Sequence, residues 1–259
     1  MQQIDHDGRT TRYRETQADA SGPTVLYVHG SGATHRLWAA QYASDGPSHP
    51  AVALDLSGHG ESDDVETEPG PGTLSAYARD VTAVARTTGA DVLVGNSLGG
   101  AVVQHVALDT DFDPAALVLA GTGAKLAVIE HLRQWLRDDF DRAIEFLHGD
   151  DRLFHDASDR TIERSMAEMR EIGRSVTARD FLTCHAFDVR DRLDGSRVPA
   201  LAVVGEHDSL TPPAYHQYLA AELPDCQYAE IDGAAHLAMA ERPADFNRVL
   251  EDFLDSIGE

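Results

Sequence analysis

The sequence predicts a single α/β domain whose sheet is built from buried strands. Short apolar runs of strand length recur along the chain, and segments with helical periodicity separate them. Most of these runs end at glycine or at small polar residues, which is typical of interior strands that lead into tight loops. With 259 residues the chain can bury one substantial core, so two full domains are not expected.

The expected elements alternate along the chain. The Asp7-Gly8 turn signal, between two short segments of strand length, predicts an opening hairpin. The strands that we expect next are residues 24–28, 51–56, 92–94, 116–120, 198–204 and 227–231. The helices that we expect are residues 34–44, residues 74–87, a helix after Ser97, one from about Pro213 and a last one at 243–257.

Residues 124–192 interrupt this alternation, because they lack strand-like runs. Apolar residues at helical spacing predict several amphipathic helices there, as in the sets Ile129, Leu132, Leu136, Phe140 and Ile162, Met166, Met169. We expect most of the Met and Phe side chains to pack as a small core, with a flexible substrate wall as the alternative. The segment is predicted to be an inserted helical cap, and residues 1–123 and 193–259 to be the core domain. The sequence leaves open which cap side chains face a site, the candidates being Phe181, Cys184, Phe187 and Val189.

The chain is strongly acidic, with 44 Asp and Glu residues against 21 basic ones and a net charge of −23. Such a surface repels phosphates and anionic lipids, which argues against nucleic-acid and membrane partners. Hydrophobic residues make up 42% of the chain and recur periodically, so the charge does not indicate disorder. All basic residues except Lys125 are arginines. This composition predicts a protein of a salt-accumulating, halophilic cell, where counterions screen the self-repulsion.

The two cysteines, Cys184 and Cys226, have no metal-site spacing, and we expect both to be reduced and buried. No apolar run is long enough to span a membrane, and the first residues lack the features of a signal peptide. The expected location is the cytoplasm. The sequence gives no indication of the oligomeric state.

The motif Gly95-Asn96-Ser97-Leu98-Gly99 follows a short apolar strand and precedes a helical pattern. Glycines on both sides of the serine allow the sharp strand-to-helix turn on which a nucleophile is lifted clear of the sheet. Ser97 is therefore the candidate nucleophile, and the amide of Leu98 a candidate donor to an oxyanion. The motif also occurs by chance, so its partners must be found elsewhere in the chain.

A second glycine-rich loop, His29-Gly30-Ser31-Gly32, follows the strand at 24–28. Small residues there allow the backbone to approach a ligand closely, so the N–H of Ser31 is the candidate for a second oxyanion donor. The alternative interpretation is an ordinary strand-to-helix turn.

Two later positions complete a possible catalytic set. Asp208 lies at the end of the strand 198–204, before a helix, where the carboxyl edge of the sheet is expected. A capping or turn aspartate is the alternative, and Glu206 and His207 are its local competitors. His236 follows the last expected strand and is the candidate base.

Other polar residues are expected to have structural roles. His59 is interpreted as a loop histidine rather than as the base, and His105 is on a helix well beyond Ser97. The acidic pairs Asp138-Asp139 and Asp150-Asp151 are interpreted as solvated faces rather than as metal ligands. No metal site is expected.

These motifs resemble those of the α/β-hydrolase superfamily along nearly the whole chain. The matching stretches are His29 to Gly32, Asp55 to Ser62, Gly95 to Gly99, Gly205 to Asp208 and Gly233 to His236. The order Ser, Asp, His is also that of the superfamily. The resemblance implies an eight-stranded, mostly parallel sheet with helices on both sides and a helical cap inserted after the sixth strand.

The resemblance implies a serine hydrolase that needs no cofactor. Ser97 would attack a carbonyl carbon, His236 would take the hydroxyl proton and Asp208 would orient the imidazole. Ser31 and Leu98 would stabilise the oxyanion through their N–H groups. The expected substrate is a small carboxylic ester, as for carboxylesterases.

Several other activities use the same residues. The chain also resembles the meta-cleavage-product C–C hydrolases, but Leu237 stands where a tryptophan is expected after the catalytic histidine. Lactonase, thioesterase and cofactor-free perhydrolase activities stay open. A non-catalytic binding protein of the same fold is the alternative from another class, although such members commonly lack a triad residue and this chain has all three.

Overall fold

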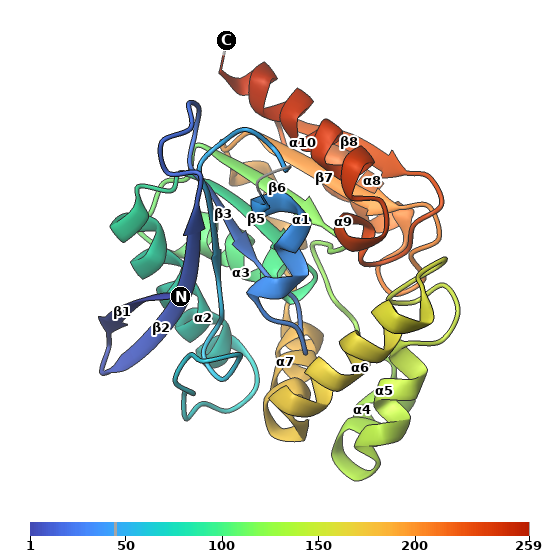
Figure 1. The fold of residues 1–259 in the computed structure, drawn as a ribbon. Helices are drawn as coiled ribbons and strands as arrows, with labels where there is room; N and C mark the ends of the chain where they lie inside the picture. The colour runs from blue at the N-terminus through green and yellow to red at the C-terminus, as the bar shows by residue number, and fades with distance from the viewer. Residues whose placement is uncertain (44–45, 259) are drawn as a thin grey trace.

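The computed structural model describes residues 1–43 and 46–258, which form one central sheet covered by helices (Figure 1). The strands are β1 (Gln2–His6), β2 (Arg9–Thr16), β3 (Val25–Val28), β4 (Ala51–Leu54), β5 (Val92–Asn96), β6 (Ala116–Ala120), β7 (Ala200–Gly205) and β8 (Cys226–Ile231). Their order across the sheet is β1-β2-β4-β3-β5-β6-β7-β8. β1 and β2 pair antiparallel, as do β2 and β4, and every other pair of neighbours is parallel. The predicted mostly parallel eight-stranded sheet is confirmed.

Helices cover both faces of the sheet. The α-helices are α1 (Ala39–Tyr42), α2 (Pro71–Thr88), α3 (Leu98–Asp109), α4 (Glu130–Asp138), α5 (Phe140–Leu147), α6 (Asp159–Ile172), α7 (Arg174–Ala186), α8 (Pro213–Glu222), α9 (Ala238–Glu241) and α10 (Pro243–Ile257). The 3₁₀ helices are η1 (His35–Trp38) and η2 (Arg190–Gly195). None of the helices that the structure describes is long and apolar enough to cross a bilayer.

Alternation along the strands builds two cores, one on each side of the sheet. On β3, Leu26 and Val28 belong to the core that contains residues of α2 and α3, whereas Val25 and Tyr27 belong to the core that contains Trp38 and residues of α10. All four of these β3 residues are fully buried. A strand that is apolar at every position is expected when both faces of a parallel sheet are covered.

The opening hairpin forms where the Asp-Gly signal predicts it. β1 and β2 pair from Gln2 opposite Tyr13 to His6 opposite Arg9. Asp7 and Gly8 between them both have positive φ, 49° and 76°. This is the backbone conformation that matches the twist of a tight hairpin.

The predicted helix 34–44 is wrong in its form, and its last residue, Ser44, lies outside the described residues. A 3₁₀ turn, η1, precedes the short helix α1. Both the backbone N–H and the ring Nδ1 of His35 lie within hydrogen-bond distance of Asp55 Oδ1, at 2.7 and 2.9 Å. We attribute the tight first turn to these two contacts with a buried carboxylate.

The segment 124–192 holds helices α4 to α7, which lie together at one end of the sheet (Figure 1). The apolar residues from Ile129 to Phe140 do not belong to one helix, although their spacing predicted one. Ile129 precedes α4 and is exposed, and Phe140 begins α5. The break is at Asp139, whose φ of −147° and ψ of 78° are not helical. Its carboxylate accepts a hydrogen bond from the N–H of Arg142 and so caps α5.

Candidate active site

Ser97 occupies the turn between β5 and α3 with φ 55° and ψ −115°, a conformation that non-glycine residues rarely adopt. The neighbouring glycines make this turn possible. A Cβ on Gly95 would overlap the backbone of Gly99, and a Cβ on Gly99 would overlap the carbonyl oxygen of Val28. The strand, the turn and the helix therefore pack too closely for any side chain at these two positions.

Asp208 and His236 lie together at the carboxyl edge of the sheet. Asp208 Oδ2 is 2.9 Å from His236 Nδ1, and both residues are buried. The other oxygen of the carboxylate accepts hydrogen bonds from the N–H groups of Leu210 and Thr211, each at 2.8 Å. This arrangement fixes the carboxylate and leaves Nε2 of the imidazole directed away from it.

The carboxylate of Asp208 is held in its charged form. Burial raises the pKa of Asp208, but the charge and hydrogen bond of His236 and the donors of Thr211 outweigh burial and bring the pKa below 3.8. The Thr211 hydroxyl donates to Oδ2 at 2.7 Å. Asp208 is therefore an anion near neutral pH, positioned to stabilise a positively charged imidazole.

Ser97 and His236 both line one cavity of about 170 Å³. No hydrogen bond joins Ser97 Oγ to His236 within the described part of the chain. The two side chains therefore face the same space without a direct contact.

A group of residues that sequence analysis did not single out connects these loops. The amide nitrogen of Asn96 donates to the carbonyl oxygens of Ala120 and His236, at 3.2 and 3.4 Å. Thr211 Oγ1 lies 3.2 Å from His236 Nδ1. Asn96 lies in the Gly95 to Gly99 motif and Thr211 follows the Gly205 to Asp208 motif by three residues, so their closeness to these motifs was the available signal.

Of the two candidate oxyanion donors, Ser31 is at the cavity and Leu98 is next to a residue that lines it, Ser97. Ser31 lines it, and Leu98 is the first residue of α3, where an N–H has no acceptor within the helix. Over residues 1–43 and 46–258, neither amide N–H donates a hydrogen bond. The α-carbon of Gly30 lies against Ser97, because a Cβ there would be 3.0 Å from Ser97 Cβ.

The cavity wall is mainly apolar and is shared by the core and segment 124–192. Phe181 and Cys184 line it, together with Leu126, Val128, Leu132, Phe146, Met169 and Leu237 among others. Phe187 and Val189 are instead buried in the core on the α2 and α3 side. Of the four residues of segment 124–192 that the sequence left open, two therefore reach the cavity.

The competitors of the candidate triad lie elsewhere. Glu206 is exposed, and its carboxylate accepts a hydrogen bond from the N–H of Gly233. His59 is buried on the loop after β4 and contacts Asp180 at 2.9 Å. His105 connects α3 to α2 through Ser75 Oγ, at 3.0 Å.

Both cysteines are free. Burial raises the pKa of Cys184 to about 12, so this thiol is neutral at the edge of the cavity. The expectation that both are buried is wrong for Cys226, which is partly exposed at the start of β8. β8 is the last strand of the sheet, so one of its edges has no neighbouring strand to cover it.

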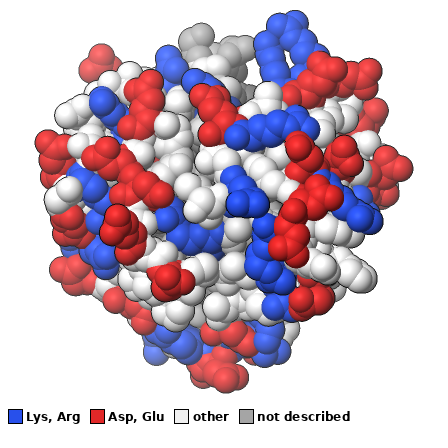
Figure 2. All heavy atoms as spheres, turned by 90° about the horizontal axis from the view of Figure 1, so that it is seen from below, with Lys and Arg blue, Asp and Glu red and all other residues white. Residues whose placement is uncertain are grey.

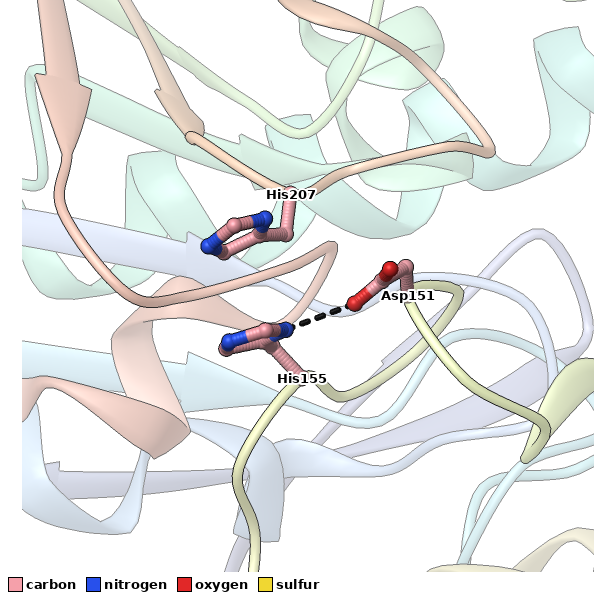
Figure 3. A group of neighbouring side chains, drawn as sticks. All are labelled: Asp151, His155 and His207. Atoms are coloured by element: carbon pink, nitrogen blue, oxygen red, sulfur yellow. Dashed lines mark hydrogen bonds and ion pairs between the residues drawn. The ribbon is translucent and has the colours of Figure 1, made fainter.

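Asp151, His155 and His207 form a small surface cluster with metal-ligand chemistry (Figure 3). One ligand atom from each lies within 4.8 Å of the other two. However, His155 Nδ1 already contacts Asp151 Oδ1 at 2.6 Å. The imidazole rings of His155 and His207 stack nearly in parallel, with centroids 3.6 Å apart. Parallel rings direct their nitrogens side by side, so both would have to turn before they could share one ion.

Comparison with known proteins agrees with this architecture. The model of the alpha/beta hydrolase family matches residues 25–249. The pimeloyl-[acyl-carrier protein] methyl ester esterase of Neisseria meningitidis serogroup C is 27% identical over 262 residues, which cover 96% of this chain and 100% of the relative.

Two further relatives extend the comparison. The 2-hydroxy-6-oxo-6-phenylhexa-2,4-dienoate hydrolase of Burkholderia cepacia is 26% identical over 253 residues, 90% of this chain and 88% of that protein. The solved structure of a thermophilic esterase is 31% identical in sequence and superposes with a TM-score of 0.87. The match covers 99% of this chain and 97% of the esterase chain. The chain belongs to the alpha/beta hydrolase family.

Proposed function

We propose that this protein is a serine hydrolase that cleaves small carboxylic esters, with Ser97 as nucleophile, His236 as base and Asp208 as its orienting partner. The observation that carries the proposal is the buried Asp208–His236 contact of 2.9 Å at the wall of the cavity that also contains Ser97. A carboxylate on Nδ1 fixes the tautomer whose Nε2 is free to accept a proton.

The reaction follows the chemistry of these side chains. His236 Nε2 takes the proton of Ser97 Oγ while that oxygen attacks the ester carbonyl carbon. The tetrahedral intermediate collapses, the C–O bond to the alcohol breaks and the imidazolium gives its proton to the leaving alcohol. Water, deprotonated by His236, then attacks the acyl-enzyme and releases the acid together with free Ser97.

We propose the N–H groups of Ser31 and Leu98 as the donors to the oxyanion. Ser31 lines the cavity and Leu98 directly follows Ser97, and neither N–H has another acceptor in the part of the chain that is described. Preorganised donors of this kind contribute on the order of 3 kcal/mol each to transition-state stabilisation.

We propose that residues 124–192 act as a cap over this site, with residues 1–123 and 193–259 as the catalytic core. The support is that both parts contribute to the cavity wall, Leu132 and Met169 from the cap and Leu237 from the core. The small apolar volume favours a short acyl group over a long chain.

C–C bond hydrolysis is the second candidate, since one relative is named as a dienoate hydrolase. It would use the same three residues on a different substrate. Lactones and thioesters are further substrates for the same chemistry, and a non-catalytic binding protein is the alternative from another class.

The test is hydrolysis of short p-nitrophenyl esters in molar KCl. Ser97→Ala is expected to abolish turnover while circular dichroism and the melting temperature stay unchanged. Ser175→Ala, on the exposed face of α7, is the matched control and should keep full activity. An inactive wild type, or an active Ser97→Ala, would contradict the proposal, and parallel assays with lactones and C–C substrates identify the preferred bond.

A further inference from the structure

One charged side chain lies in the otherwise neutral wall of the cavity. Of the residues that line it, Arg152 alone carries a permanent charge. Arginine is costly to place in an apolar wall unless it has a partner. A cation at this position therefore needs an explanation.

The neighbours of Arg152 leave its charge uncompensated. One terminal nitrogen, Nη1, donates to the carbonyl oxygen of Phe146 at 2.8 Å, and the guanidinium carbon lies 3.8 Å from the centroid of the Phe146 ring. No Asp or Glu among the described residues comes within ion-pair distance of it. By contrast, Arg179 pairs with Asp64, and Arg192 with Asp109.

The free edge of the guanidinium suits a carboxylate. Neither Nε nor Nη2 has a hydrogen-bond partner among residues 1–43 and 46–258, and these two nitrogens form the fork that binds carboxylates in a bidentate manner. The contact with Phe146 fixes the plane of the group. Little conformational freedom would be lost on binding.

The backbone connects Arg152 to the candidate catalytic loops. Its carbonyl oxygen accepts a hydrogen bond from the N–H of His236 at 3.1 Å, and the carbonyl of Leu153 does the same for Leu237 at 3.0 Å. The carbonyl of Asp151 accepts from the N–H of Ser209, beside Asp208, at 3.0 Å. The arginine is therefore held at a fixed place relative to the reacting groups.

We propose that Arg152 forms a carboxylate subsite, so that the preferred substrates are esters whose acyl part ends in a free carboxylate, such as half-esters of short dicarboxylic acids. This inference depends on the proposed ester hydrolysis at Ser97. It adds a substrate class that an apolar cavity alone would not select. The chain as a whole carries a net charge of −23 and repels anions, so binding of a carboxylate requires a local positive group such as Arg152.

The test uses two isosteric substrates. One is the monoethyl ester of a short linear dicarboxylic acid, and the other carries a primary amide in place of its free carboxylate. Wild type is expected to prefer the carboxylate at least about tenfold in kcat/KM. Arg152→Gln should reduce that preference to about one, mainly through KM, and Arg152→Lys should keep part of it.

A matched control separates this role from packing. Arg142→Gln, which removes a charge from the exposed cap helix α5, should leave the preference unchanged. A merely structural Arg152 would lower turnover of both substrates equally, and a wild type without preference would also overturn the inference. Neither result would affect the proposed function, which depends on hydrolysis of the neutral ester.

A binding measurement keeps the inference testable without turnover. Calorimetric titration of the dicarboxylic acid itself should show binding to wild type and to Ser97→Ala, and at least tenfold weaker binding to Arg152→Gln. Equal affinity for all three proteins would overturn the subsite.

Discussion

Nε2 of His59, on the loop after β4, lies 2.9 Å from Oδ2 of Asp180 on α7, and both side chains are fully buried. The Tyr77 hydroxyl donates to the other oxygen of Asp180 at 2.6 Å. Arg179 closes the cluster with a hydrogen bond to the backbone oxygen of Val65 at 2.7 Å. A buried polar cluster thus joins segment 124–192 to the core.

Breaking this pair should destabilise the protein strongly. Asp180→Ala leaves an imidazole and a phenol without their buried partner, and losing one member of such a pair costs about 3–5 kcal/mol. Urea denaturation at pH 6 measures the free energy of unfolding. Asp141→Ala, which removes an exposed partner of Arg170, should have little effect, and an equal loss in both variants would contradict this account.

The same pair should make stability depend on pH. Burial lowers the pKa of His59, but the charge and hydrogen bond of Asp180 outweigh it and raise the pKa above 6.5, against a smaller lowering by Arg179. Because the pKa of His59 is higher in the folded state than in the unfolded state, the protonated imidazole stabilises the native state fully below pH 6.5. This stabilisation is lost as the pH rises through the pKa of His59 in the folded state.

The measurement is the free energy of unfolding of wild type and of His59→Gln between pH 5.5 and 9. The advantage of wild type over the variant should shrink as the pH rises. An advantage that stays constant, or that grows with pH, would show that His59 does not titrate in this way.

The parallel sheet was predictable because most of its strands, such as β3, β4, β6 and β7, are uninterrupted apolar runs. The last helix, Pro243–Ile257, has the predicted bounds, since a proline at its first position and a regular apolar period mark it clearly. The break at Asp139 was not predictable from spacing, because the apolar period continues across it while the backbone does not.

The candidate site was only partly visible in the sequence. Ser97, Asp208 and His236 stand in recognisable motifs at strand ends, and the structure brings the latter two into contact. Arg152 follows an acidic pair interpreted as a solvated face, and its contact with His236 joins positions that are 84 residues apart. Local patterns carry no signal for such long-range pairs.

Asp208→Asn should lower kcat by about 10⁴-fold while the fold is kept. The amide oxygen can still accept from the N–H groups of Leu210 and Thr211, but the amide nitrogen would then donate to His236 Nδ1. This places the proton of the imidazole on Nε2, which can no longer accept the Ser97 proton.

Steady-state kinetics with a p-nitrophenyl ester check this prediction. Glu206→Gln is the control, because Glu206 is a neighbouring carboxylate with no contact to His236. A greater loss in Glu206→Gln than in Asp208→Asn would mean that the wrong carboxylate has been assigned.

Gly205→Ala should impair both folding and activity. A Cβ at this position, the end of β7, would overlap the carbonyl oxygens of Ala234 and Ala235, just before His236. The loop that carries His236 must then move away from Asp208. Gly72→Ala, in α2 with open space around it, should be neutral or slightly stabilising. Melting temperature and kcat/KM test both variants, and a fully active, stable Gly205→Ala would contradict this packing.

Salt should stabilise the protein. Acidic side chains outnumber basic ones by 44 to 21, and Figure 2 shows many of them on the face seen from below, with basic side chains between them. Repulsion among them acts over the Debye length, which falls from about 10 Å at 0.1 M salt to about 3 Å at 1 M. The melting temperature should therefore rise from low to molar KCl. Sucrose stabilises by exclusion and does not screen charge, so it should not reproduce the steep rise at the lowest KCl concentrations. A melting temperature that does not change with KCl would mean that self-repulsion is negligible and would remove the physical basis for a halophilic origin.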